Sequence, residues 1–188
     1  MKMLLGLTGT NSVQGRNVRR ALVDSLNVMH VNIKQPVIDM MASLFRITPH
    51  EYEHHFEKTK TITQFNQPAN NMFRGVEASI CAGNKNTLID LCINAMARQD
   101  SISDRTEGTL ISGINNDTEA NFVRSRGGQI IHLINQDHLE LAELVRSKND
   151  FFIYINNKTG LTDDLVSQML TYAKASNFFK GNDRAPSH

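Results

Sequence analysis

The sequence predicts an α/β fold in which a mainly parallel sheet is covered by helices on both faces, giving three layers. A continuous apolar run over residues 3–7 ends at a Thr8-Gly9 turn, as expected of a strand buried on both faces. Strand-like and helix-like segments then alternate along the chain, which is typical of parallel sheets. The 188 residues suffice for one domain with a sizeable core.

Apolar periodicity places the individual elements. Further strands are predicted at residues 28–33, 109–114, 129–134 and 151–155. Helical spacing predicts helices at residues 18–26, 37–45, 72–82, 88–96, 118–126, 139–145 and 161–173, with a short helix at 49–58. Gly127 and Gly128 are predicted to end the helix before them, because glycine readily adopts the left-handed conformation of a helix C-cap.

We expect one domain over residues 1–175. Within it, the polar stretch at residues 48–71 has the composition of a flap or lid rather than of a core. Residues 176–188 are polar and contain both glycine and proline, so a flexible tail is expected there.

The charge balance excludes partners that need a strong global field. Lys and Arg number 20 and Asp and Glu 19, so the net charge is +1 and no nucleic-acid partner is indicated. The first apolar run is too short for a signal peptide or membrane span, so a cytoplasmic protein without membrane association is expected. Cys81 and Cys92 lie in apolar segments and lack the spacing of a metal site or disulfide framework.

The loop after the first strand is a candidate phosphate site. Backbone N–H groups and the helix N-terminus point at an anion bound in such a loop. The candidate nucleotide- or phosphate-binding residues are Gly9, Asn11, Gly15, Arg16 and Asn17. The loop departs from the Walker A pattern by one extra residue between its glycines, by arginine in place of lysine, and by asparagine in place of a magnesium-binding hydroxyl. A connection that binds nothing is the alternative.

Three segments carry a family resemblance. Residues 110–133 read LISGINNDTEANFVRSRGGQIIHL, residues 33–45 read IKQPVIDMMASLF, and residues 150–165 contain an apolar strand and a helix start. With these segments, the chain from Leu4 to about Tyr172 resembles the phage-type deoxynucleoside monophosphate kinases. The resemblance implies a P-loop kinase-like domain with an ATP site at the first loop and a deoxynucleotide site under a flap.

The resemblance also implies where charged residues belong. Arg16 occupies the position of the phosphate-binding lysine and is the catalytic candidate if the protein is active. The implied substrate cleft consists of Pro36, Gly113, Asn115 and Glu119, of which Glu119 keeps the charge that the family has there. Gly113 and Asn115 replace the aspartate and arginine of a D-x-R turn. Ile38 and Ala69 fall where a lysine and a further arginine are expected.

Phosphoryl transfer depends on positioning and on charges that stabilise the transferring phosphate. Because these charges are replaced, we expect a pseudokinase that has lost phosphoryl transfer and acts by binding, in a phage-infected bacterial host. No catalytic residue or cofactor is assigned to it. The alternative is a divergent active kinase that transfers phosphate from ATP, with Mg²⁺, to a deoxynucleoside monophosphate.

Apolar residues in or beside the polar stretch are candidates for a protein contact. Phe56, Phe65, Met72 and Phe73 are expected to be exposed there, and grouped exposed apolar residues tend to mark an interface. The partner would be a second copy of the chain, or a host or phage protein.

His50, Glu51 and His54 form an H-E-x-x-H pattern on the predicted short helix. In zinc proteases this spacing places two histidine ligands on one helix face. Because no third ligand is evident, we favour surface histidines and predict no metal, with a zinc hydrolase as a distant alternative. Four arginines are expected on solvated helix faces: Arg19, Arg20, Arg124 and Arg126.

Overall fold

The computed structural model describes residues 3–9, 13–54, 61–62, 67–100, 106–135 and 144–155. The helix predicted at residues 139–145 lies mostly outside these ranges, and the helix predicted at 161–173 and the tail at 176–188 lie wholly outside them. The chain divides into two compact units, residues 1–30 together with 99–188, and residues 31–98.

The order of the described helices and strands matches the predicted alternation, except that the two short strands β3 and β4 were not predicted. In chain order the elements are β1 (Met3–Thr8), α1 (Val13–Leu26), β2 (Val28–Asn32), α2 (Gln35–Phe45), α3 (Pro49–His54), β3 (Thr61–Ile62), β4 (Gln67–Pro68), α4 (Ala69–Cys81), α5 (Thr87–Asp100), β5 (Gly108–Ser112), α6 (Asp117–Ser125), β6 (Gln129–Asn135) and β7 (Phe151–Ile155).

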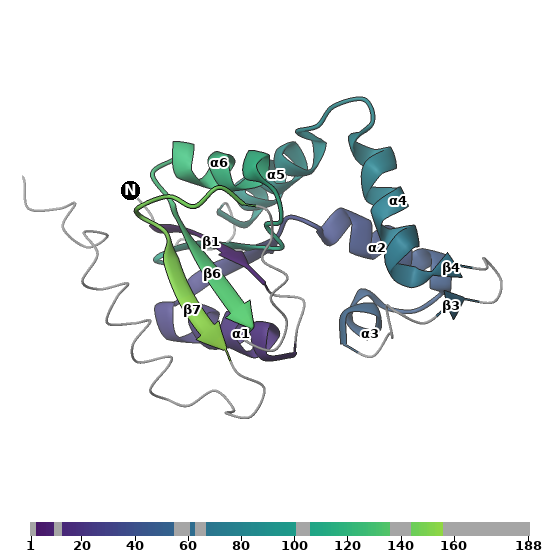
Figure 1. The fold of residues 1–188 in the computed structure, drawn as a ribbon, viewed down its shortest axis with the longest axis horizontal. Helices are drawn as coiled ribbons and strands as arrows, with labels where there is room; N and C mark the ends of the chain where they lie inside the picture. Colours follow the sequence, from purple (N-terminus) through teal and green to yellow (C-terminus); the bar gives the residue numbers. More distant parts are fainter. Residues whose placement is uncertain are drawn as a thin grey trace, which may run out of the picture. The chain divides into compact units, whose positions relative to one another are not determined.

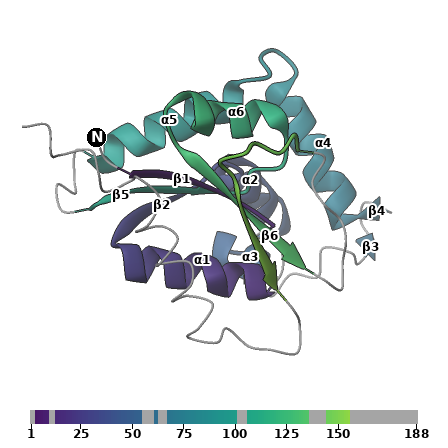
Figure 2. The ribbon, with the colours of Figure 1, turned by 60° about the vertical axis from the view of Figure 1, so that its left-hand side comes forward.

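A five-stranded parallel sheet organises the first unit, with the strand order β2-β5-β1-β6-β7 (Figures 1 and 2). The first strand pairs with β5 on one side, where Leu5 lies opposite Leu110. It pairs with β6 on the other side, where Thr8 lies opposite His132. The predicted α/β fold and the interior position of the first strand are therefore confirmed.

The side chains of β1 alternate between two apolar layers. Leu5 and Leu7 pack with Val18 and Leu22 of α1 in the main buried cluster. On the opposite face, a Cβ added at Gly6 would lie 2.6 Å from the side chain of Ile114 and within contact distance, 3.4 Å, of Val123 in α6. Figure 2 accordingly shows α1 and α6 on opposite sides of the sheet. One strand buried on both faces requires the uninterrupted apolar run that opens the sequence.

The glycine pair after α6 ends that helix as predicted. Gly127 has φ of 74°. Its N–H donates to the carbonyl of Arg124, and the N–H of Gly128 donates to the carbonyl of Val123. This pair of bonds is the Schellman motif, which satisfies two of the last helical carbonyls and turns the chain into β6.

The second unit has its own buried centre, which corrects the expectation that residues 48–71 stand outside any core. Tyr52 of α3 is fully buried. Its ring stacks on Phe45 of α2 at 6.2 Å and on Phe73 of α4 at 6.5 Å between centroids. A 2.5 Å ion pair between Lys34 and Glu77 also joins the start of α2 to α4. Tyr52, a residue of the expected flap, thus contributes to the packing of this unit.

No helix in the described part of the chain is long and apolar enough to cross a membrane. Of the two cysteines, Cys92 is buried and Cys81 is partly exposed.

Candidate functional site at the carboxyl edge of the sheet

The carboxyl ends of β1 and β5 form a topological switch point in the first unit. These two strands are neighbours in the sheet. The chain leaves β1 toward α1 on one face and leaves β5 toward α6 on the other (Figure 2). In open parallel sheets, ligands bind in the crevice that such diverging connections leave open. This edge is therefore the candidate site.

Gly9 shapes the exit of the chain from β1. Its φ is 72°, a left-handed conformation that suits glycine. A Cβ at this position would lie 2.2 Å from the carbonyl oxygen of Leu133 in β6. The requirement for glycine is therefore both conformational and steric.

The phosphate-binding candidates that follow are divided between loop and helix. The structure corrects the start of the predicted helix, since α1 begins at Val13. Gly15, Arg16 and Asn17 therefore lie in the first turns of α1 and not in a preceding loop. Gly15 is buried, Arg16 is half-buried and Asn17 is exposed. Asn11 lies outside the described residues.

Gly113, Asn115 and Glu119 lie together after β5. Gly113 has φ of 80°, and Asn116 caps α6 by accepting a hydrogen bond from the N–H of Glu119. The buried carboxylate of Glu119 accepts a 3.0 Å hydrogen bond from the N–H of Asn115. Glu119 thus lies at the start of a helix, where the macrodipole favours a negative charge. The hydrogen bond from Asn115 uses the carboxylate of Glu119 to hold the loop after β5, so this oxygen is not directed at a ligand.

Histidines bind the hydroxyls at both strand ends. The hydroxyl oxygen of Thr8, the last residue of β1, lies 3.3 Å from Nδ1 of His132. The hydroxyl oxygen of Ser112, the last residue of β5, lies 2.7 Å from Nε2 of His30. Burial, aided by the nearby positive charge of Arg19, lowers the pKa of His30 to about 4. At neutral pH His30 is therefore uncharged, and neither strand ends on a carboxylate.

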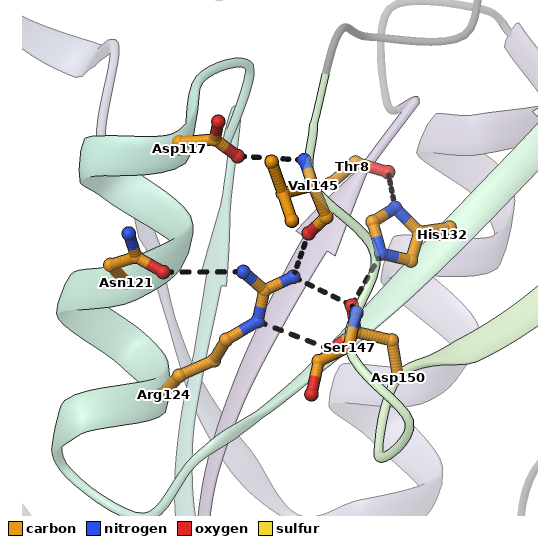
Figure 3. A network of polar contacts seen from close by, with 8 residues as sticks. All are labelled: Thr8, Asp117, Asn121, Arg124, His132, Val145, Ser147 and Asp150. Atoms are coloured by element: carbon orange, nitrogen blue, oxygen red, sulfur yellow. Dashed lines mark hydrogen bonds and ion pairs between the residues drawn. The ribbon is translucent and has the colours of Figure 1, made fainter.

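A buried ionic network continues from His132 (Figure 3). Its Nε2 lies 3.1 Å from Oδ2 of Asp150, and Arg124 of α6 donates to both oxygens of that carboxylate, at 2.6 and 3.3 Å. The N–H of Ser147 donates to Asp150 as well, at 2.8 Å. Arg124 is further held by the carbonyl of Val145. The prediction that Arg124 lies on a solvated face is therefore wrong, because its guanidinium is the counterion of a buried carboxylate.

The network sets the charge states of its members. Burial lowers the pKa of His132, and the nearby Arg124 and Arg146 lower it further, against the opposing effect of Asp150. For Asp150, burial acts to raise the pKa, but hydrogen bonds from Arg124, Ser147 and His132 outweigh it and lower the pKa overall. At neutral pH the network thus holds a neutral imidazole beside an ionised carboxylate.

The remaining predicted residues belong to the second unit or lie outside the described ranges. Pro36 stands in the first turn of α2, where its missing N–H costs nothing. Met72 is buried and Phe73 stacks on Tyr52, so their expected exposure is wrong, because the second unit uses both in its own packing. Phe65 lies outside the described residues.

The H-E-x-x-H pattern has a local structural role. Glu51 accepts hydrogen bonds from the N–H and hydroxyl of Thr48, whose hydroxyl accepts in return from the N–H of Glu51. This is a capping box at the start of α3, which accounts for a glutamate at that position. Within the ranges that the structure describes, His50 and Glu51 belong to no group of ligands able to hold a metal, and the side chain of His54 lies outside the described part.

The histidines and Asp150 were not singled out from the sequence. A usable signal existed, since His30, His132 and Asp150 are polar residues inside or beside apolar strands. A polar group buried in a strand requires a partner, so each of these positions predicts a hydrogen-bonded pair. Only the partner's identity needs the structure.

The fold and the site define a parallel α/β protein whose candidate site lies at the topological switch point of the sheet. The groups at this site are the glycine backbone after β1 and β5, two hydroxyls and the uncharged His30. No family model and no curated protein matches the chain. Its likeness to deoxynucleoside monophosphate kinases therefore stays a prediction.

Proposed function

We propose that this protein is a deoxynucleoside monophosphate kinase-like binding protein that holds a phosphate ester at its switch-point edge without transferring phosphate. The observation that carries the proposal is the composition of that edge. Thr8 and Ser112 end the two strands, and each hydroxyl is bound to a histidine. Transfer needs a carboxylate that organises Mg²⁺ and cations that stabilise developing charge, and the loss of each such contact slows the reaction about a hundredfold or more.

Positions where the resemblance implies cations support the loss of transfer. Ile38 and Ala69 are both buried in the second unit, at 4% and 0% exposure. Both are apolar and packed, so neither position holds a cation that a substrate phosphate could contact. This replacement changes the chemistry of the expected substrate site.

Phosphate binding still has support in the first unit. Gly9 brings the backbone out of β1 in a left-handed conformation, and α1 starts at Val13. Backbone N–H groups at such a helix start attract anions, and half-buried Arg16 lies in the first turns of the same helix. A phosphate ester held by these groups needs no metal, so its affinity should not depend on Mg²⁺.

We predict that ATP turnover with any of the deoxynucleoside monophosphates stays at background, whereas ATP binds equally well with and without Mg²⁺. A coupled kinase assay and isothermal titration calorimetry measure the two. Arg16→Ala is expected to weaken ATP about tenfold or more, because a charged hydrogen bond is lost. The matched control is Arg20→Ala, an exposed arginine of the same helix, which should change little.

The active-kinase alternative predicts the opposite pattern. Turnover on the order of 1–100 per second, abolished by Arg16→Ala and dependent on Mg²⁺, would show that the protein transfers phosphate.

Self-association is a second proposed function, and exposed apolar residues on α2 favour it. Met40 and Leu44 are 52% and 46% exposed. They are four residues apart, so they lie on the same helix face. The net charge of +1 gives little repulsion between copies. We therefore place the contact between two copies on α2, in place of the buried Met72 and the stacked Phe73.

The double variant Met40→Lys and Leu44→Lys is expected to raise the dissociation constant of a dimer by tenfold or more, since it places charge in an apolar contact. Light scattering over a concentration series measures this. Ala78→Lys with Asn94→Lys, two exposed positions of the same unit, adds equal charge as a control. A wild-type protein that stays monomeric throughout the series contradicts the dimer.

A further inference from the structure

Two adjacent residues of β6, His132 and Leu133, contact the end of β1 and the residue after it. Thr8 lies opposite His132 in the sheet, and both are buried. The residues that follow these two make the second contact, because Gly9, just after β1, passes so close to the carbonyl of Leu133 in β6 that no Cβ fits. The direction in which the chain leaves β1 therefore depends on these two contacts with β6.

The hydrogen-bond directions in the network follow from its charge states. The ionised carboxylate of Asp150 can only accept, so Nε2 of His132 carries the proton that it donates to Oδ2. In a neutral imidazole the other nitrogen then accepts. Nδ1 of His132 is thus the acceptor, and the hydroxyl of Thr8 is the donor. Arg124 fixes the carboxylate from the opposite side (Figure 3).

Such a chain of contacts orients side chains more than it stabilises the fold. A buried group of arginine, carboxylate and imidazole pays a desolvation cost that its mutual attraction largely offsets, so apolar packing would serve stability as well. What apolar packing cannot do is fix the rotamer of Thr8 by a directed hydrogen bond. The stacking of His132 on Phe152, with ring centroids 4.9 Å apart, further limits the orientation of the imidazole.

We infer that His132 is a positioning residue, which acts through the hydroxyl of Thr8 to set the backbone at Gly9 and thereby the affinity of this edge for a phosphate ester. The link to affinity rests on the proposed function. The link to Gly9 stands on the geometry alone. Asp150 and Arg124 contribute by holding the imidazole in the tautomer that accepts from Thr8.

Two matched pairs of variants test this role. Thr8→Val removes the hydroxyl and keeps the shape, whereas Thr8→Ser keeps the hydroxyl. In His132→Asn the amide oxygen takes the place of Nδ1 and accepts from Thr8, whereas in His132→Gln the amide nitrogen takes the place of Nε2 and reaches only Asp150. One member of each pair therefore keeps the bond to Thr8.

The readouts are the backbone amide resonance of Gly9 in ligand-free protein and the dissociation constants of ATP and inorganic pyrophosphate. Thr8→Val and His132→Gln are expected to move the Gly9 resonance and weaken both ligands about tenfold. Thr8→Ser and His132→Asn should leave the resonance and the affinities near wild type. A preference for ATP over pyrophosphate identifies a nucleotide, and equal affinities identify a free phosphate anion.

The outcomes separate the two claims. An unchanged Gly9 resonance in both Thr8→Val and His132→Gln overturns the positioning role, even if ATP binds to the wild type. If the wild type binds neither probe, the proposed function fails, and the Gly9 resonance still decides the positioning role. Because Thr8→Val keeps the β-branched shape of the side chain, it is expected to fold even if His132→Gln does not.

Discussion

Asp150→Ala is expected to lower the free energy of unfolding by about 3–5 kcal/mol at neutral pH, the cost of breaking a buried ion pair by removing one partner. The side chain of Asp150 is 1% exposed, and it accepts from Arg124, His132 and the N–H of Ser147. All three donors lose this acceptor in the variant. Denaturant unfolding followed by circular dichroism measures the change.

The matched control is Asp24→Ala, an exposed aspartate on α1 of the same unit. Its effect is expected to stay within about 0.5 kcal/mol, as for most surface substitutions. A loss below about 1 kcal/mol for Asp150→Ala would mean that water or neighbouring groups replace the carboxylate, and it would contradict a tightly buried network.

The same network predicts how stability depends on pH. The pKa values of His132 and Asp150 both lie below their ordinary values of 6.5 and 3.8. A group whose pKa is lowered by folding contributes stability above its unfolded pKa and loses that contribution as the pH falls. The wild type should therefore lose stability below pH 6.5 through His132, and further below pH 3.8 through Asp150. In Asp150→Ala the part of the second loss that comes from Asp150 should be absent when unfolding is repeated across this range.

Gly9→Ala is expected to lower the free energy of unfolding by about 2–5 kcal/mol, through left-handed strain and overpacking together. The φ of 72° is unfavourable for alanine, and the new Cβ would lie 2.2 Å from a backbone oxygen that no rotamer change can move. The backbone of β1 or β6 must shift in response. We therefore also expect this variant to lose phosphate-ester binding.

Gly75→Ala is the control for the glycine effect itself. Gly75 lies inside α4, and nothing lies within 4 Å of an added Cβ. Alanine at an open helical position is expected to stabilise by about 0.5–1 kcal/mol, opposite in sign to Gly9→Ala. If Gly9→Ala proves neutral, the close approach to Leu133 is not what shapes the exit from β1.

Local signals in the sequence were enough to predict most elements of the described fold. The apolar run of β1, Pro36 at the start of α2 and the glycine pair after α6 each act within one turn or one strand, so neighbouring residues determine them. The start of α1 was predicted too late, at residue 18 instead of Val13, because a Gly-rich segment reads as loop even when a helix has begun. Such boundaries depend on the weak preferences of single residues.

The candidate site was predictable in place but not in composition. A loop after the first buried strand and a turn after β5 meet at one edge of any parallel sheet, so Gly9 and Gly113 could be assigned there from order alone. The partners of the hydroxyls could not. Thr8 and His132 are 124 residues apart in the sequence, and only the register of β1 against β6 places them opposite each other.

The α/β class and the buried first strand follow from the sequence alone, because apolar periodicity and turn residues report on the backbone within a few residues. Which polar and apolar side chains are available at the surface depends on the packing of distant segments. This packing buries Met72, stacks Phe73 on Tyr52 and turns Arg124 inward to Asp150. The physical reason is that exposure and hydrogen bonding depend on residues brought close by packing, whereas composition and spacing describe only residues that are neighbours along the chain.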